Sequence, residues 1–119
     1  MIVTTYFANL RKLPKDTVPI SICGKAPEWY KGLQYKKLAP KYGFFQVWKK
    51  THDNDYYVRC FKEQVLSPLN PDIVVSELVK MANSKDIALV CYEKPKDFCH
   101  RHLVADWLNS HGYSVNELT

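Results

Sequence analysis

Apolar residues occur along this chain in short runs and in helical repeats, which together predict alternating strands and helices. Residues 2–7 are rich in β-branched and aromatic side chains, and residues 18–22 are similar, so both segments are expected to be strands. Residues 87–91 form a continuous apolar run, which is typical of a central parallel strand covered on both faces. Residues 114–118 are expected to add an edge strand.

Helical repeats are clearest in the second half of the chain. One helix is predicted to begin at Asn54 or Asp55, either of which can cap it, and to run to about residue 66. A second helix is predicted after Asn70, its N-cap, with Pro71 at the first helical position. Proline is tolerated there because the missing N–H has no partner within the helix.

A third helix is predicted after the apolar run, with Asp97 as its N-cap and Gly112 positioned to end it. The pattern over residues 28–52 is mixed. It indicates two short helices interrupted at Pro40 and Gly43.

The order of these elements predicts the fold class. Strands separated by helices are typical of an α/β protein, here a single-domain three-layer Rossmann-like sandwich with a short, mostly parallel sheet. The 119 residues have room for one core, so residues 1–119 are expected to form one domain. Such sheets bind ligands beyond the carboxyl ends of their strands. Residues 9–12, 21–25 and 92–101 are therefore expected to converge there.

The net charge of +5 is unevenly distributed. Residues 1–50 carry ten Lys or Arg and two acidic residues, whereas residues 51–119 carry seven basic and ten acidic residues. This asymmetry favours an anionic partner for the N-terminal half, in first place a nucleotide-like small molecule and in second place a nucleic acid. A solvated lysine surface explains the same distribution.

No apolar run is long enough to span a bilayer, and residues 1–6 do not resemble a signal peptide. A cytoplasmic protein without a membrane partner is expected, and the pattern leaves open whether it forms a homo-oligomer. The four cysteines include no Cys-x-x-Cys pair, which indicates reduced thiols. Cys23 and Cys60 are interpreted as small buried apolar groups.

Residues 91–101 join the buried strand to a helix N-terminus, where exposed amides and the helix dipole attract anions. Arg101 is the best candidate for the anion partner, because its planar fork suits phosphate or carboxylate, and His100 lies beside it. An ion pair of Arg101 with Glu93 or Asp97 is the structural alternative.

The same segment contains candidate catalytic groups. Cys99 next to His100 at a helix N-terminus is the arrangement that lowers a thiol pKa, so Cys99 is a candidate nucleophile and Glu93 a candidate general base. A structural Cys99 that fills space is the alternative. Cys91, Cys99, His100 and His102 match no common zinc spacing, and adjacent ligands Cys99 and His100 would strain a site. No metal and no cofactor are predicted.

Further ligand-binding candidates lie on the converging segments. Asn9, Arg11 and Lys25 offer polar or positive groups, and Trp29 and Tyr92 are candidates to stack on a flat ring. For each aromatic residue, packing within the core is the structural alternative.

The segment from Cys91 to Trp107 resembles the C-terminal signature of an uncharacterised family, domain of unknown function 488. An apolar strand ends in Cys91 and Glu93, a short loop follows, and Cys99-His100-Arg101 begins an apolar helix. Residues 6–14, 19–22 and 37–40 are similar to a branch of the same family. The resemblance implies no particular reaction.

The favoured interpretation is therefore a domain that binds a phosphate-bearing small molecule, a nucleotide or nucleotide-derived signal. Sensing or sequestration of such a signal would suit phage–bacterium defence. The first alternative is a hydrolase or transferase that acts on a nucleotide or nucleic acid, and the second is a nucleic-acid-binding module.

Overall fold

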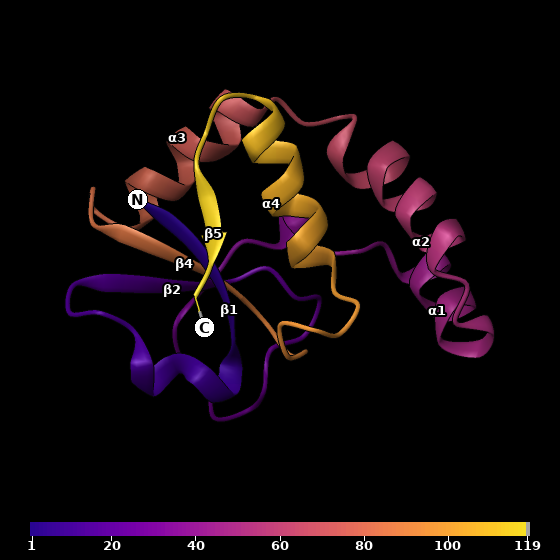
Figure 1. Ribbon diagram of the computed structural model, residues 1–119, viewed down its shortest axis with the longest axis horizontal. Helices are drawn as coiled ribbons and strands as arrows, with labels where there is room; N and C mark the ends of the chain where they lie inside the picture. Colours follow the sequence, from indigo (N-terminus) through magenta and orange to yellow (C-terminus); the bar gives the residue numbers. More distant parts are fainter. Residues whose placement is uncertain (119) are drawn as a thin grey trace.

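The computed structural model describes residues 1–118, which fold around one five-stranded sheet (Figure 1). The strands lie in the order β3-β2-β4-β1-β5, and every pair is parallel. Their bounds are β1 Ile2–Tyr6, β2 Thr17–Ser21, β3 Leu33–Gln34, β4 Asp86–Cys91 and β5 Val115–Glu117. The structure confirms the predicted α/β class and the three-layer Rossmann-like sandwich, with a sheet that is wholly parallel.

Strand β4 is the centre of the sheet, as its apolar sequence predicts. It pairs with β2 on one side and with β1 on the other. All residues from Ile87 to Cys91 are buried, because neighbouring strands and helices cover both faces. The pairs Tyr6–Cys91 and Ser21–Val90 bring the carboxyl ends of β1, β2 and β4 to one edge.

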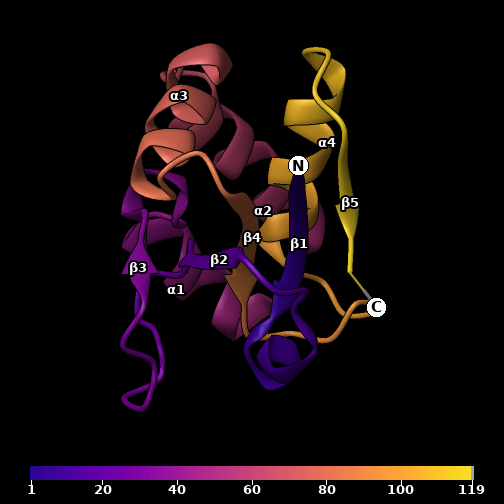
Figure 2. The same cartoon turned by 90° about the vertical axis from the view of Figure 1, so that its left-hand side faces the viewer.

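Helices pack on the sheet and also extend beyond it. Helices α3 (Pro71–Met81) and α4 (His100–Ser110) contact β4, and α4 also contacts β1. Helices α1 (Tyr42–Thr51) and α2 (Asn54–Phe61) form a pair that lies to one side of the sheet (Figure 1), joined to the remainder through α4. In Figure 2, α3 and α4 lie above the strands of the sheet. None of the described helices is long and apolar enough to cross a membrane.

Short irregular helices complete the chain. The 3-10 helices are η1 (Phe7–Lys12), directly after β1, and η2 (Lys36–Leu38), and a π-helical turn, η3 (Lys62–Leu66), continues α2. The predicted end of that helix near residue 66 is therefore confirmed.

Several predicted boundaries are wrong. Gly43 does not interrupt a helix but lies inside α1, and the two-residue strand β3 was not predicted. Asp53 caps α2, because its carboxylate accepts a hydrogen bond from the Tyr56 amide at 3.1 Å. The predicted caps Asn54 and Asp55 are already helical.

Helix α3 begins as predicted and α4 does not. The Asn70 side chain accepts hydrogen bonds from the amides of Asp72 and Ile73, with Pro71 at the first helical position. In α4 the N-cap is Cys99 rather than Asp97. The shift matters because it places the Cys99 side chain at the helix entrance.

Candidate active site

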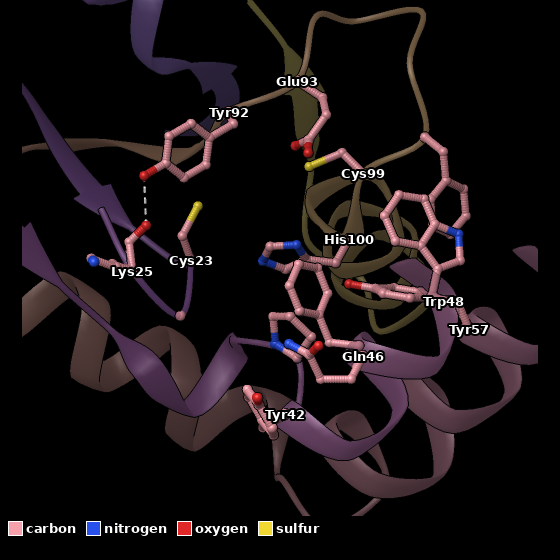
Figure 3. Close-up of a pocket in the computed structure, with 14 residues that line it drawn as sticks. Cys23, Lys25, Tyr42, Gln46, Trp48, Tyr57, Tyr92, Glu93, Cys99 and His100 are labelled. Carbon is pink, nitrogen blue, oxygen red and sulfur yellow. Dashed lines mark hydrogen bonds between the residues drawn. The ribbon is translucent and has the colours of Figure 1, made fainter. Parts of the chain in front are cut away.

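The main cavity lies beyond the carboxyl ends of β2 and β4 and has a volume of about 470 Å³. Its walls come from the loops after these two strands, from the start of α4, and from α1 and α2 (Figure 3). The lining residues are Cys23, Gly24, Lys25, Pro40, Tyr42, Phe45, Gln46, Trp48, Tyr57, Tyr92, Glu93, Phe98, Cys99 and His100. This is the edge at which parallel α/β sheets bind ligands.

Aromatic rings form much of the wall. Trp48 and Phe98 are stacked with ring centroids 5.6 Å apart, and Tyr57 meets Phe98 edge-on at 5.0 Å. Tyr42 is 77% exposed although it lines the cavity, so its ring stands at the rim. Such a wall offers flat apolar faces to a ring-shaped ligand.

Cys99 brings a sulfur atom into this cavity. Its backbone is extended (φ −155°, ψ 141°), and the helix starts at His100. The amide of Arg101 donates a hydrogen bond to the Cys99 sulfur. The sulfur thus lies at the positive end of the helix dipole, which favours a thiolate.

Two neighbours reinforce that preference. The Cys91 thiol hydrogen-bonds to the Cys99 sulfur, and His100 does the same and adds a positive charge, so together they lower the pKa of Cys99 well below its ordinary value. Burial alone would lower the pKa of His100, but the hydrogen bond and the charge of Cys99 raise it. Both shifts favour a thiolate at Cys99 beside a protonated His100.

The backbone fixes the orientation of His100. Its Nε2 lies 2.7 Å from the carbonyl oxygen of Ile22, directly after β2, and must donate a proton to it because a carbonyl only accepts. The Cys91 sulfur is 3.5 Å from Nε2 and 3.9 Å from Nδ1. Nδ1 is therefore the ring nitrogen that is available for a hydrogen bond with Cys99.

Glu93 lies on the side of the Cys99 sulfur that faces away from His100 (Figure 3). Burial, followed by the negative charge of Cys99 and a hydrogen bond to it, raises the pKa of Glu93 to about 7. A carboxyl group with this pKa can both donate and accept a proton near neutral pH.

Cys91, Cys99 and His100 also place one donor atom each within 4.8 Å of one another, a spacing that a soft metal ion could share. The prediction that adjacent ligands Cys99 and His100 would strain a metal site stays a prediction, although the structure brings their donor atoms close together. The hydrogen bonds described above account for all three groups, and we interpret them as a thiol–imidazole cluster.

Lys25 and Tyr92 lie at the cavity, as do Glu93, Cys99 and His100. The Tyr92 hydroxyl donates a hydrogen bond of 2.7 Å to the Lys25 carbonyl oxygen (Figure 3) and so joins the two loops that flank the opening. Two of the three segments expected to converge, residues 21–25 and 92–101, do so.

The third segment, residues 9–12, contributes nothing to the cavity wall. Asn9 is buried and donates hydrogen bonds to the Thr5 hydroxyl at 3.0 Å and to the Leu118 carbonyl at 3.4 Å. Arg11 is exposed on η1, and Trp29 is 61% exposed with its edge against Phe7. The prediction that Asn9, Arg11 and Trp29 lie at the binding cavity is therefore wrong.

Arg101 is the largest correction. Its side chain is completely buried and holds the Glu117 carboxylate of β5 in a bidentate pair, Nε–Oε1 3.1 Å and Nη2–Oε2 2.7 Å. The Thr4 hydroxyl donates a second hydrogen bond to Oε1. The structural alternative, an ion pair, is therefore correct, but its partner is Glu117 of β5 rather than Glu93 or Asp97. Arg101 lines no described cavity.

Sequence reasoning missed the residues that α1 and α2 supply to the cavity: Tyr42, Phe45, Gln46, Trp48 and Tyr57. The available signal was the aromatic spacing Tyr42, Phe45, Trp48, since residues three apart share one helix face. Cys23, interpreted as a filler of the core, is buried as expected but also forms part of the wall.

Comparison with known proteins identifies the family. Residues 5–112 match the family model DUF488-N3a, described as the active DUF488-N3 subclade. No curated protein and no solved structure matches the chain. The matched region includes β2, β4 and the start of α4, and therefore every residue of the cavity wall. The chain belongs to the DUF488-N3a family.

Proposed function

We propose that this protein is a cysteine-dependent hydrolase or transferase that acts on a nucleotide or nucleotide derivative. One observation carries the proposal: Cys99 lines an aromatic cavity together with the His100 ring and the Glu93 carboxyl group (Figure 3). A purely structural cysteine needs neither neighbour. Activated nucleophiles, in contrast, combine a lowered pKa with an adjacent acid or base.

The cavity walls support a flat, anionic substrate. A volume of about 470 Å³ lies within the range of small-molecule sites, roughly 300–1,000 Å³. Stacking against rings such as Tyr42 and Phe45 would hold a base. Lys25, exposed at the opening, would meet a phosphate.

The proposed reaction has two half-reactions. The Cys99 thiolate attacks an electrophilic carbon of the substrate and forms a C–S bond, while the bond to the leaving group breaks with its electron pair and Glu93 supplies the proton. The ionised Glu93 then takes a proton from water, or from a second acceptor, whose oxygen displaces the sulfur. The thiolate and the protonated Glu93 are regenerated, which is the cycle of covalent catalysis.

Binding without turnover, in a sensor or sequestering protein, would use the same cavity but would not need the reactive cluster. The experiment that separates the two incubates the protein with a panel of ribonucleotides and deoxyribonucleotides and follows both small molecules and intact protein by mass spectrometry. We expect one nucleotide to be converted and a covalent adduct to accumulate on Cys99.

The matched variants are Cys99→Ser and Cys23→Ser, since both cysteines line the cavity but only Cys99 is hydrogen-bonded to His100. We expect Cys99→Ser to bind the nucleotide and leave it intact, whereas Cys23→Ser retains turnover. Tight binding with no conversion by the wild-type protein would identify a binding protein, and conversion by Cys99→Ser would eliminate the nucleophile.

A further inference from the structure

Three of the four cysteines form one buried cluster, and the proposed reaction uses only one of them. Cys91 lies at the end of β4 with none of its surface exposed, and its sulfur lies within 4.8 Å of the Cys99 sulfur. Cys23 is near enough to both for the three thiols to affect one another's pKa. Among the described residues all four cysteines are free thiols.

We propose that Cys99 and Cys91 form a reversible redox pair, in which hydrogen peroxide oxidises Cys99 and Cys91 then closes a disulfide with it. This inference rests on the proposed function, because it takes the same Cys99 thiolate as its reactive group. The disulfide would remove the nucleophile from the cavity and protect it from irreversible oxidation.

The geometry gives the two sulfurs different roles. Cys99 lines the cavity, through which a molecule as small as peroxide can reach it, whereas Cys91 lies behind it. Their sulfurs lie within 4.8 Å of each other, compared with about 2.05 Å in a disulfide. Cys99 is the residue before the first turn of α4, and closing the gap would require its side chain to move toward Cys91. Redox-sensing cysteines are thiolates that an oxidant can reach, next to a resolving thiol. Cys99 is 4% exposed, so an oxidant would reach it only through the cavity that it lines.

The chemistry balances with peroxide as the only oxidant. The Cys99 thiolate attacks one peroxide oxygen, the O–O bond breaks, and the departing hydroxide takes the Glu93 proton to give water and a sulfenic acid. The Cys91 thiol then attacks the sulfenic sulfur, the S–O bond breaks, and a second water leaves. Two thiols have lost two electrons, and one peroxide has become two water molecules.

Tryptic mapping tests this pairing directly, because each cysteine lies on its own peptide. Trypsin cleaves after Lys96 but not at Lys94, which precedes Pro95, so Cys91 is on residues 86–96 and Cys99 on residues 97–101. Cys23 is on residues 16–25 and Cys60 on residues 60–62. The wild-type protein is treated with one equivalent of hydrogen peroxide, without substrate, at mildly acidic pH where ordinary thiols are protonated.

We expect peptides 86–96 and 97–101 to become linked and to separate again with dithiothreitol. Cys91→Ser, or Cys91→Ala if the serine variant is unstable, should stop at a sulfenic acid that dimedone traps, and excess peroxide should carry it to the sulfinic acid. Cys60→Ser is the matched control, since Cys60 is buried on α2 outside the cavity, and it should oxidise like the wild type.

A link between residues 16–25 and 97–101 would overturn the assignment, and so would a wild-type Cys99 that passes directly to the sulfinic acid. The proposed function fails by a different result, because turnover by Cys99→Ser would refute it even if the disulfide forms. Conversely, a wild-type enzyme that turns over nucleotide but never links the two peptides would refute only the redox pair.

Discussion

The buried ion pair between Arg101 and Glu117 leads to a prediction about stability. Glu117→Gln removes the negative charge while keeping the length of the side chain, and it leaves a guanidinium with none of its surface exposed. The substituted amide can accept through its oxygen, but its NH₂ group faces an arginine N–H. Only one of the two hydrogen bonds, 3.1 Å and 2.7 Å long in the wild type, can then persist.

The magnitude follows from this burial. Removing one partner of a buried pair costs about 3–5 kcal/mol, chiefly because the remaining charge is uncompensated. The Glu117 side chain retains 19% exposure, so water can partly replace it, and we expect the lower end, about 3 kcal/mol. In a domain of this size, each kcal/mol lowers the melting temperature by roughly 4 °C, which gives a decrease of roughly 12 °C.

Urea and thermal unfolding of both proteins measure this effect. Asp86→Asn is the control, because it breaks an exposed ion pair between Asp86 and the N-terminal amine, and it should cost no more than about 1 kcal/mol. Replacing both partners by methionine should recover much of the loss, since it leaves no buried charge.

The reasoning would be refuted if the free energy of unfolding of Glu117→Gln lay within about 1 kcal/mol of the wild-type value, which is the contribution of an exposed ion pair. If that protein also bound nucleotide less tightly, Arg101 would be a ligand-binding residue after all.

Four further predictions concern the cavity. The rate of iodoacetamide alkylation at Cys99 should stay nearly constant from pH 5 to 8, because its thiolate persists. In the urea-unfolded protein the rate should fall about tenfold for each pH unit below the ordinary thiol pKa of about 8.5. Parallel pH profiles of the folded and unfolded protein would refute the lowered pKa. Turnover should fall above pH 7, because Glu93, with its pKa raised to about 7, loses its proton there. Glu93→Gln should abolish that pH dependence. An unchanged pH profile in the variant would exclude Glu93 as the acid and base of the reaction. Tyr42→Ala should weaken nucleotide binding by about 1–3 kcal/mol in calorimetric titration, whereas Ile73→Ala, which truncates another exposed apolar side chain on α3, should not. Equal affinities of Tyr42→Ala and the wild type would remove Tyr42 from the site. Dialysis against a strong chelator should leave activity intact, and loss with recovery on adding zinc would reassign Cys91, Cys99 and His100 as metal ligands.

The parts of the fold that local chemistry determines were predictable. The apolar run at residues 87–91 requires burial on both faces, and β4 is the central strand. Asn70 and Pro71 begin a helix by their own hydrogen-bonding properties, and α3 starts there. The catalytic candidates Glu93 and Cys99 could also be predicted from the sequence, because the loop that carries them follows a predicted parallel strand.

Contacts distant in sequence were not predictable from one chain. Arg101 was assigned to a ligand because no pattern indicates that Glu117, on another element, would reach it. Helix α1 was misjudged for a different reason. It buries only Phe44, and its other aromatic side chains line a cavity, so the continuous apolar stripe of an ordinary core helix is missing.

The position of β4 between β1 and β2 also governs how the chain can assemble during synthesis. Strand β1 is synthesised before its partners among the described strands, β4 and β5, which begin at Asp86 and Val115. In a growing chain β1 therefore stays without these partners until β4 has been made, and of the described strands β2 and β3 can pair earlier. Strand pairings this distant close slowly, because a long loop must be ordered before any contact compensates for it. The exposed apolar strand β1 is thus where a chaperone would bind the nascent protein, and where an incomplete chain would aggregate.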